Sequence, residues 1–142
     1  MLNMHFREFI ELLEKHGVSY LVMDGYAVGY HGFPRYTGDL DIFIGISKEN
    51  SKKIMEVFSE FGVPDLTISE KDFLEEEIVV EIGREPLKIQ VLTGIDGMTF
   101  GECLNSKVYF DAGEELNVPF IGFEELLENK VHRESLWKRH GA

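Results

Sequence analysis

The sequence predicts an α/β (α+β) domain in which helices flank one mixed central β-sheet. Two observations support this: the first half alternates helical with strand-like stretches, and the second half is a series of short strand-like runs before a final helix. Consecutive short runs favour antiparallel pairing, so the sheet should be mixed and largely antiparallel toward its end. With 142 residues, 44% of them hydrophobic, the chain is expected to form a single domain over residues 1–142.

The first half begins with an amphipathic helix expected from Asn3 to His16. Its apolar side chains recur at i, i+3, i+4 and i+7, and Gly17 follows as a stop; they are Phe6, Phe9, Ile10 and Leu13. A strand is expected at residues 18–23, a short helix at 25–32 and a second strand at 40–44. Ser47 then caps a helix that ends at Gly62.

The second half is expected to contain a hairpin of residues 78–82 and 87–92. Later elements are a short helix opened by a Thr99–Glu102 capping box, a strand at 107–111, an extended run at 115–121 and a last helix. The last helix should begin at Phe123 and bury one stripe of side chains, namely Phe123, Leu126, Leu127 and Val131. For residues 69–77 the spacing of Ser69 and Asp72 allows a short helix, but we favour a solvated acidic face.

Two carboxylates on the second strand are the main candidates for chemistry. Asp39 and Asp41 are two residues apart, so in a strand their side chains point to the same face. Leu40, Ile42 and Ile44 point the other way, so the acid face is free for chemistry while the other stays apolar. Adjacent carboxylates suit a divalent metal ion. The alternative is a pair of exposed acids on an edge strand.

Charge and composition exclude several function classes. A net charge of −12 argues against nonspecific nucleic-acid binding as a function, because such binding relies on neutralising many phosphates. The single Cys103 excludes an internal disulfide and a cysteine-based zinc site. No apolar run reaches membrane-spanning length and no signal-peptide pattern is seen at Met1, so we expect a cytoplasmic protein with no membrane partner.

Three stretches together resemble a known family. They are GYAVGYHGFPRYTGDLDIFI from Gly25, KIQVLTGIDG from Lys88 and VPFIGFEELLENK from Val118. They are similar to small prokaryotic proteins of the nucleotidyltransferase superfamily, the group that includes DNA polymerase beta. The family pattern is a glycine turn after a strand, a helix, and an Asp-hydrophobic-Asp pair on the next strand. The resemblance therefore implies a nucleotidyltransferase-like fold.

The resemblance also implies an activity, a cofactor and site residues. The family transfers a nucleoside monophosphate from a nucleoside triphosphate (NTP) to a hydroxyl acceptor with Mg²⁺, which makes Asp39 and Asp41 the expected catalytic residues and metal ligands. Glycine at a turn lets backbone N–H groups approach phosphate, and arginine suits phosphate oxygens. The expected nucleotide-binding residues are Asp24, Gly25, Arg35, Thr37, Gln90 and Lys130.

Two residues depart from the family pattern. The third carboxylate is expected where this chain has Gln90, and an amide neither neutralises a dication nor accepts a proton. Glu81 could substitute for it or be a solvent-facing strand residue. Asp24 stands where the family has glycine and adds negative charge beside the expected phosphate site. The alternative function is therefore a catalytically degenerate binding or antitoxin-type partner.

At 142 residues the chain is expected to lack the extra helical domain with which larger members hold their acceptor. Either the acceptor is small, or a protein partner or homodimer supplies that surface. An exposed apolar patch near residues 120–127 would favour such assembly, and we expect weak dimerisation.

Overall fold

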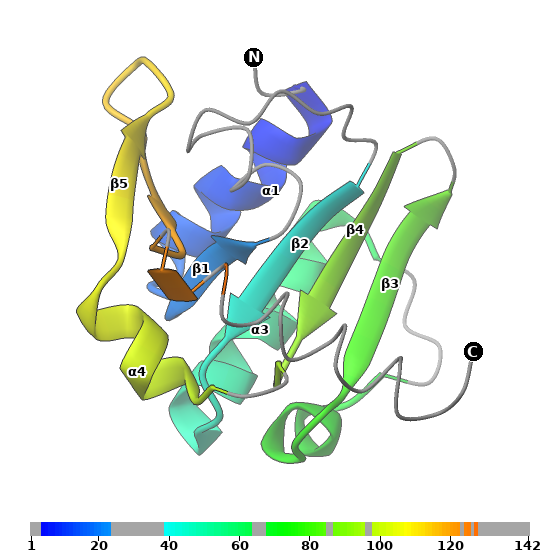
Figure 1. Cartoon of the computed structure of the whole chain (residues 1–142). Coiled ribbons are helices and arrows are strands. Elements are labelled where there is room, and N and C mark those ends of the chain that lie inside the picture. Colours follow the sequence, from blue (N-terminus) through cyan, green and yellow to red (C-terminus); the bar gives the residue numbers. More distant parts are fainter. Residues whose placement is uncertain are drawn as a thin grey trace.

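The computed structural model describes residues 4–23, 39–63, 68–84, 87–95, 98–122, 124–125 and 127. These residues form a six-stranded sheet in the order β3-β4-β2-β1-β6-β5, flanked by helices (Figure 1). The strands are β1 (Tyr20–Met23), β2 (Asp39–Ile44), β3 (Val79–Arg84), β4 (Leu87–Leu92), β5 (Val108–Asp111) and β6 (Asn117–Phe120). The helices are α1 (Met4–Lys15), α3 (Lys48–Phe61), the 3₁₀ helix η1 (Glu70–Leu74) and α4 (Phe100–Asn105). The predicted α+β class is confirmed.

Strand β2 lies inside the sheet, third in the strand order. It pairs antiparallel with β1 and parallel with β4, while β3–β4 and β5–β6 are antiparallel pairs and β1–β6 is a parallel one. The sheet is therefore mixed, as expected. The alternative of two acids on an edge strand is wrong, because β2 has a hydrogen-bonded neighbour on each side.

Helices α1 and α3 lie next to each other behind the sheet in Figure 1. Their interface is aromatic: the centroid of the Phe9 ring lies 6.2 Å from that of the Phe58 ring and 5.1 Å from that of the Phe61 ring. The predicted stripe of α1 is fully buried and consists of Phe6, Phe9, Ile10 and Leu13. The two helices thus cover one face of the sheet and leave the catalytic candidates on the other.

The helix ends follow the capping rules. The Ser47 hydroxyl accepts a hydrogen bond from the backbone N–H of Asn50 at 3.0 Å, and α3 ends at Gly62 with φ +93°. At α4 the Thr99 hydroxyl and the Glu102 carboxylate form the predicted capping box. The boundaries of α3 and the start of α4 are therefore set by local capping residues.

Asn50 ties the start of β1 to the end of β2. Its side-chain oxygen accepts from the backbone N–H of Ser19 at 2.7 Å, and its amide donates to the carbonyls of Ser19 and Gly45 at 3.2 and 2.8 Å. The side chain is 5% exposed, so these hydrogen bonds compensate the burial of its polar atoms. They fix β1 against β2 at the far end of β2 from Asp39.

Three expectations need correction. The segment after Ser69 is a 3₁₀ helix, because the Ser69 N–H donates to the Asp72 carboxylate at 2.9 Å and Phe73 is fully buried; preferring a merely solvated face was wrong. Leu127 is 46% exposed and so is not part of a buried stripe. Phe120 and Ile121 are buried by the sheet core, which removes them from the expected exposed apolar patch. The predicted helix at 25–32, and also Phe123, Leu126 and Val131, lie outside the described residues.

Among the described residues, no helix combines the length and the apolar character needed to cross a bilayer.

Lys15 and His16 at the end of α1 meet Glu60 on α3. Lys15 Nζ lies 2.7 Å from one carboxylate oxygen of Glu60, and His16 Nε2 lies 2.9 Å from the other. These two hydrogen bonds, with that from Lys15 the larger, lower the pKa of Glu60 from its ordinary value of 4.5. The stabilisation is therefore complete above about pH 4.5 and is lost as the pH falls through the lowered pKa.

We expect Glu60→Gln to be less stable than the wild type at pH 7, with a smaller difference at pH 3, because the stabilisation is lost as the pH falls through the lowered pKa of Glu60. The measurement is the urea midpoint of both proteins at both pH values. The effect should be small because the pair is exposed. Glu8→Gln makes the same chemical change on α1 away from the contact and serves as the control. A difference between wild type and Glu60→Gln that is equal at both pH values would contradict the expectation.

Candidate functional site

Asp39 and Asp41 occupy the first half of β2, and their side chains share the sheet face opposite α1 and α3. Between and after them, Leu40, Ile42 and Ile44 are fully buried, while both acids are partly exposed. The alternation predicted from the sequence is confirmed. It places the two carboxylates at positions i and i+2 of a strand that is hydrogen-bonded to a neighbouring strand on each side.

The carboxylates are only partly satisfied by the described protein. Within the part of the chain that the structure describes, Oδ1 of Asp39 is buried and accepts no hydrogen bond; Oδ1 of Asp41 is likewise buried without a donor, although Asp41 makes another interaction. A buried carboxylate oxygen without a donor is costly. The described residues therefore leave Oδ1 of Asp39 available to coordinate a cation.

Strand β4 brings Gln90 directly opposite Asp41. The parallel β2–β4 pair aligns Asp39 with Lys88 and Asp41 with Gln90, and the β3–β4 pair aligns Gln90 with Glu81. Directly paired residues lie on the same face of a sheet, so all five side chains belong to the acid face. Gln90 thus stands where the family resemblance asks for a carboxylate. Among the residues that the structure describes, no three His, Cys, Asp or Glu side chains are placed to hold a metal ion together.

Lys88 is the residue that the sequence interpretation missed. Its ammonium lies 3.5 Å from the Glu81 carboxylate, and the two side chains are 21% and 53% exposed. Glu81 is therefore solvent-facing, as one of its two interpretations held, and it is engaged by a lysine rather than by the acid pair. The alternation of Lys88 with Gln90 was visible in the sequence, but the alignment of Lys88 with Asp39 required the register of β2 against β4.

Five of the predicted nucleotide-binding residues lie outside the described residues; they are Asp24, Gly25, Arg35, Thr37 and Lys130. The described residues on either side of segment 24–38 are nevertheless informative. Met23 ends β1 and is paired with Asp41, so the chain leaves β1 and enters β2 at the acid end of the sheet. Asp24 directly follows this position in the sequence.

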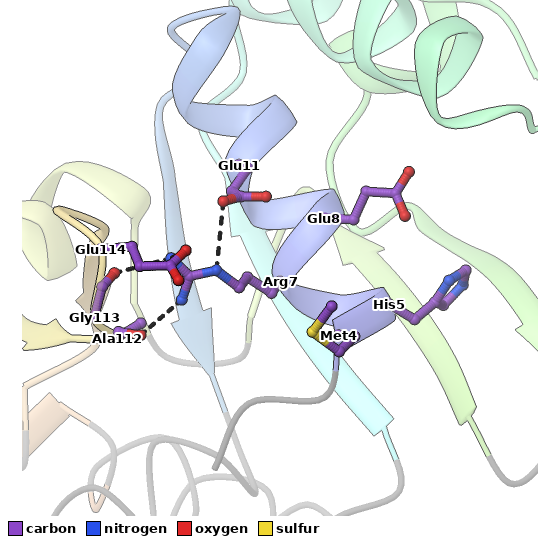
Figure 2. A pocket seen from close by; sticks show the side chains of 8 residues that line it. All are labelled: Met4, His5, Arg7, Glu8, Glu11, Ala112, Gly113 and Glu114. Carbon is purple, nitrogen blue, oxygen red and sulfur yellow. Dashed lines mark hydrogen bonds and ion pairs between the residues drawn. The ribbon is translucent and has the colours of Figure 1, made fainter.

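A separate hollow of about 820 Å³ lies between α1 and the β5–β6 turn, and neither Asp39 nor Asp41 lines it (Figure 2). Arg7 reaches across it from α1. Its guanidinium donates to the carbonyls of Ala112 and Gly113 at 2.6 and 2.8 Å, and it lies 3.7 Å from the Glu114 carboxylate. The contact that Arg7 makes across this hollow is structural, because its guanidinium donates hydrogen bonds to backbone carbonyls.

Arg7 should therefore contribute to stability. In the β5–β6 turn the non-glycine residue Glu114 has φ +52°, a left-handed conformation that is unfavourable for a residue with a side chain and that the hydrogen bonds from Arg7 help to hold. We expect Arg7→Met to lower the free energy of unfolding by about 2 kcal/mol, because two hydrogen bonds from a charged donor are lost. Chemical denaturation measures this difference.

The controls for Arg7 separate its hydrogen-bonding geometry from its charge. Arg7→Lys keeps the charge but not the planar fork that contacts two carbonyls, so it should also be destabilised. Glu114→Gln removes only the ion pair between Arg7 and Glu114, whose side chain is 89% exposed. It should change the free energy of unfolding by less than about 0.5 kcal/mol. An Arg7→Lys protein as stable as the wild type would show that charge alone matters.

Comparison with known proteins yields a likeness of fold. No protein-family model matches the chain, and no curated protein matches it. Among solved structures, the crystal structure of a candidate nucleotidyltransferase from Thermotoga maritima is similar, with a TM-score of 0.69 and 15% sequence identity. The similarity covers 94% of this chain and 85% of that one. At this identity the likeness concerns the fold, and the fold of this chain is nucleotidyltransferase-like.

Proposed function

We propose that this chain, on its nucleotidyltransferase-like fold, transfers a nucleoside monophosphate from an NTP to a hydroxyl acceptor, with Mg²⁺ bound by Asp39 and Asp41. The observation that carries the proposal is the acid pair on β2, where Oδ1 of Asp39 is buried without a hydrogen-bond donor among the described residues. The Thermotoga maritima likeness supports a fold of the right kind.

The donor set fits a hard cation. Mg²⁺ prefers carboxylate oxygens and retains water ligands, so two aspartates and the neutral amide oxygen of Gln90 are suitable partners. When bound, the ion would reduce the negative charge on the triphosphate and on the leaving pyrophosphate. Asp39 and Asp41 supply the two negative charges that one dication requires, and their strand is fixed by β1 and β4 on its two sides.

The proposed reaction replaces a phosphoanhydride bond of the NTP with a phosphodiester bond to the acceptor. The acceptor oxygen forms a bond to the α-phosphorus, the bond from that phosphorus to the oxygen bridging to the β-phosphate breaks, and pyrophosphate leaves. The hydroxyl proton passes to water in this proposal, because the amide of Gln90 cannot accept it. Gly25, Arg35, Thr37 and Lys130 are proposed to contact the nucleotide, and Asp24 to weaken its triphosphate binding.

The test is calorimetric titration of the protein with ATP, GTP, CTP and UTP, each with and without Mg²⁺. Pyrophosphate release is then followed in the presence of small hydroxyl compounds and of lysate fractions. We expect Mg²⁺-dependent binding of at least one NTP and pyrophosphate release when the acceptor is present. The absence of Mg²⁺-dependent binding of any of the four NTPs would overturn the proposal.

The second candidate function is a degenerate member that acts as a binding or antitoxin-type partner. Gln90 favours it, because the position opposite Asp41 has no charge and no proton acceptor. Under this function, Asp39→Ala with Asp41→Ala leaves partner capture from lysate intact. The same double variant would lose NTP binding under the first function, so one protein distinguishes the two.

A further inference from the structure

We propose that Lys88 binds the phosphate chain of the nucleotide and that Glu81 holds Lys88 in the ligand-free protein. This inference rests on the proposed function, since it assigns a residue to the same site. A phosphate oxygen in place of the Glu81 carboxylate would give the ammonium a charge-assisted hydrogen bond.

The register places Lys88 beside the acid pair. Lys88 is directly opposite Asp39 on the neighbouring parallel strand, and neighbouring strands are about 4.8 Å apart. On its other side Lys88 is aligned with Gly83, which has no side chain. The ammonium can therefore move between the Glu81 side and the Asp39 side of β4 without displacing a neighbouring side chain at position 83.

The balance of charge on this face favours an anionic ligand that brings a cation with it. Asp39, Asp41 and Glu81 carry three negative charges and Lys88 one positive charge. The neutral Gln90 stands where the family resemblance places a third carboxylate, so only Asp39 and Asp41 are left to hold one dication. In addition to that dication, Lys88 supplies positive charge at the site. A nucleotide with its bound Mg²⁺ satisfies both features at once.

The Lys88–Glu81 contact is suited to exchange. At 3.5 Å the two charged atoms are beyond the distance of a strong charge-assisted hydrogen bond, and the Glu81 side chain is 53% exposed while that of Lys88 is 21% exposed. Glu81 can therefore turn to water at little cost, since exposed ion pairs contribute little. Lys88 keeps its aliphatic part against the sheet in either state.

The experiment measures the affinity for ATP with Mg²⁺ and, separately, for tripolyphosphate in EDTA, by calorimetry. Lys88→Met should weaken both affinities about tenfold, and Lys88→Arg should restore most of the loss. Glu81→Gln should tighten both up to about fivefold, because the competing carboxylate is gone. Lys52→Met and Glu76→Gln are matched controls on exposed positions of α3 and of the turn before β3, and should change neither affinity. Circular dichroism confirms folding of each variant.

The outcomes separate this inference from the proposed function. If Lys88→Met binds both probes as the wild type does, the role of Lys88 is overturned and the proposed function stands. If tripolyphosphate binding is lost in Lys88→Met while the wild type shows no Mg²⁺-dependent nucleotide binding, the phosphate role of Lys88 stands and the proposed function fails. If the wild type binds neither probe, both are overturned.

Discussion

Asp39→Asn combined with Asp41→Asn should abolish Mg²⁺-dependent nucleotide binding, with a loss of at least about a hundredfold in affinity. Asparagine keeps the shape of aspartate and removes its charge, so the double variant loses both negative charges that hold the dication. Interactions between a divalent ion and carboxylates at a partly buried site contribute several kcal/mol, and each 1.36 kcal/mol is a factor of ten. Titration with MgATP, and with Mn²⁺ as a spectroscopic substitute, measures the loss.

The same substitutions should not harm the fold. Oδ1 of Asp39 is buried and has no hydrogen-bond donor among the described residues, so replacing this carboxylate with an amide breaks no described hydrogen bond at that atom and removes negative charge from a buried oxygen. We therefore expect the metal-free double variant to melt at or above the temperature of the wild type. Glu8→Gln with Glu49→Gln removes the same charge from α1 and α3, which cover the opposite sheet face, and controls for net charge. Equal MgATP affinity in the double variant and in this control would exclude the acid pair as the metal site.

Much of the fold could be predicted from the sequence because its signals are local. The stripe that includes Phe6 and Phe9, the Ser47 cap and the glycine at 62 each act within a few residues, and the structure has α1 and α3 in those places. The η1 helix was misjudged for the opposite reason. Its acidic residues suggested solvent exposure, whereas its formation depends on burying Phe73 against α3, where the rings of Phe73 and Phe58 lie 5.6 Å apart.

The sequence predicted those relations within the candidate site that depend on one strand, and not those that depend on how two strands pair. Alternation along β2 was enough to place Asp39 and Asp41 on one face, since strand geometry fixes that relation. The neighbours of the acid pair depend on how β2 aligns with β4, which is a long-range pairing that no local pattern encodes. Resemblance supplied a role for Gln90 but none for Lys88, although Lys88 begins the same quoted stretch; the alignment of Lys88 with Asp39 depends on the pairing of β2 with β4.

Gln90 is the position where one substitution should increase function. It is directly opposite Asp41, and β4 is held between β2 and β3, so a side chain placed there has a fixed direction. Gln90→Asp creates a third carboxylate on the acid face. Without a metal ion, like charges on adjacent strands repel each other, so the variant should be less stable than the wild type. With Mg²⁺ bound, the added charge is neutralised.

We therefore expect Gln90→Asp to bind Mg²⁺ at least about tenfold more tightly than the wild type. We also expect Mg²⁺ to raise the melting temperature of Gln90→Asp by more than it raises that of the wild type. Melting curves with and without Mg²⁺ and calorimetric titration with the ion measure both effects. The control is Gln90→Asn: asparagine has nearly the same shape as aspartate but no charge, so this variant should behave like the wild type in both measurements. If Gln90→Asp is destabilised in EDTA but not rescued by Mg²⁺, the new carboxylate does not reach a metal held by Asp39 and Asp41, and Gln90 then lies beside the ion without facing it. Rescue together with faster pyrophosphate release would identify the missing charge at position 90 as the main limit on catalysis.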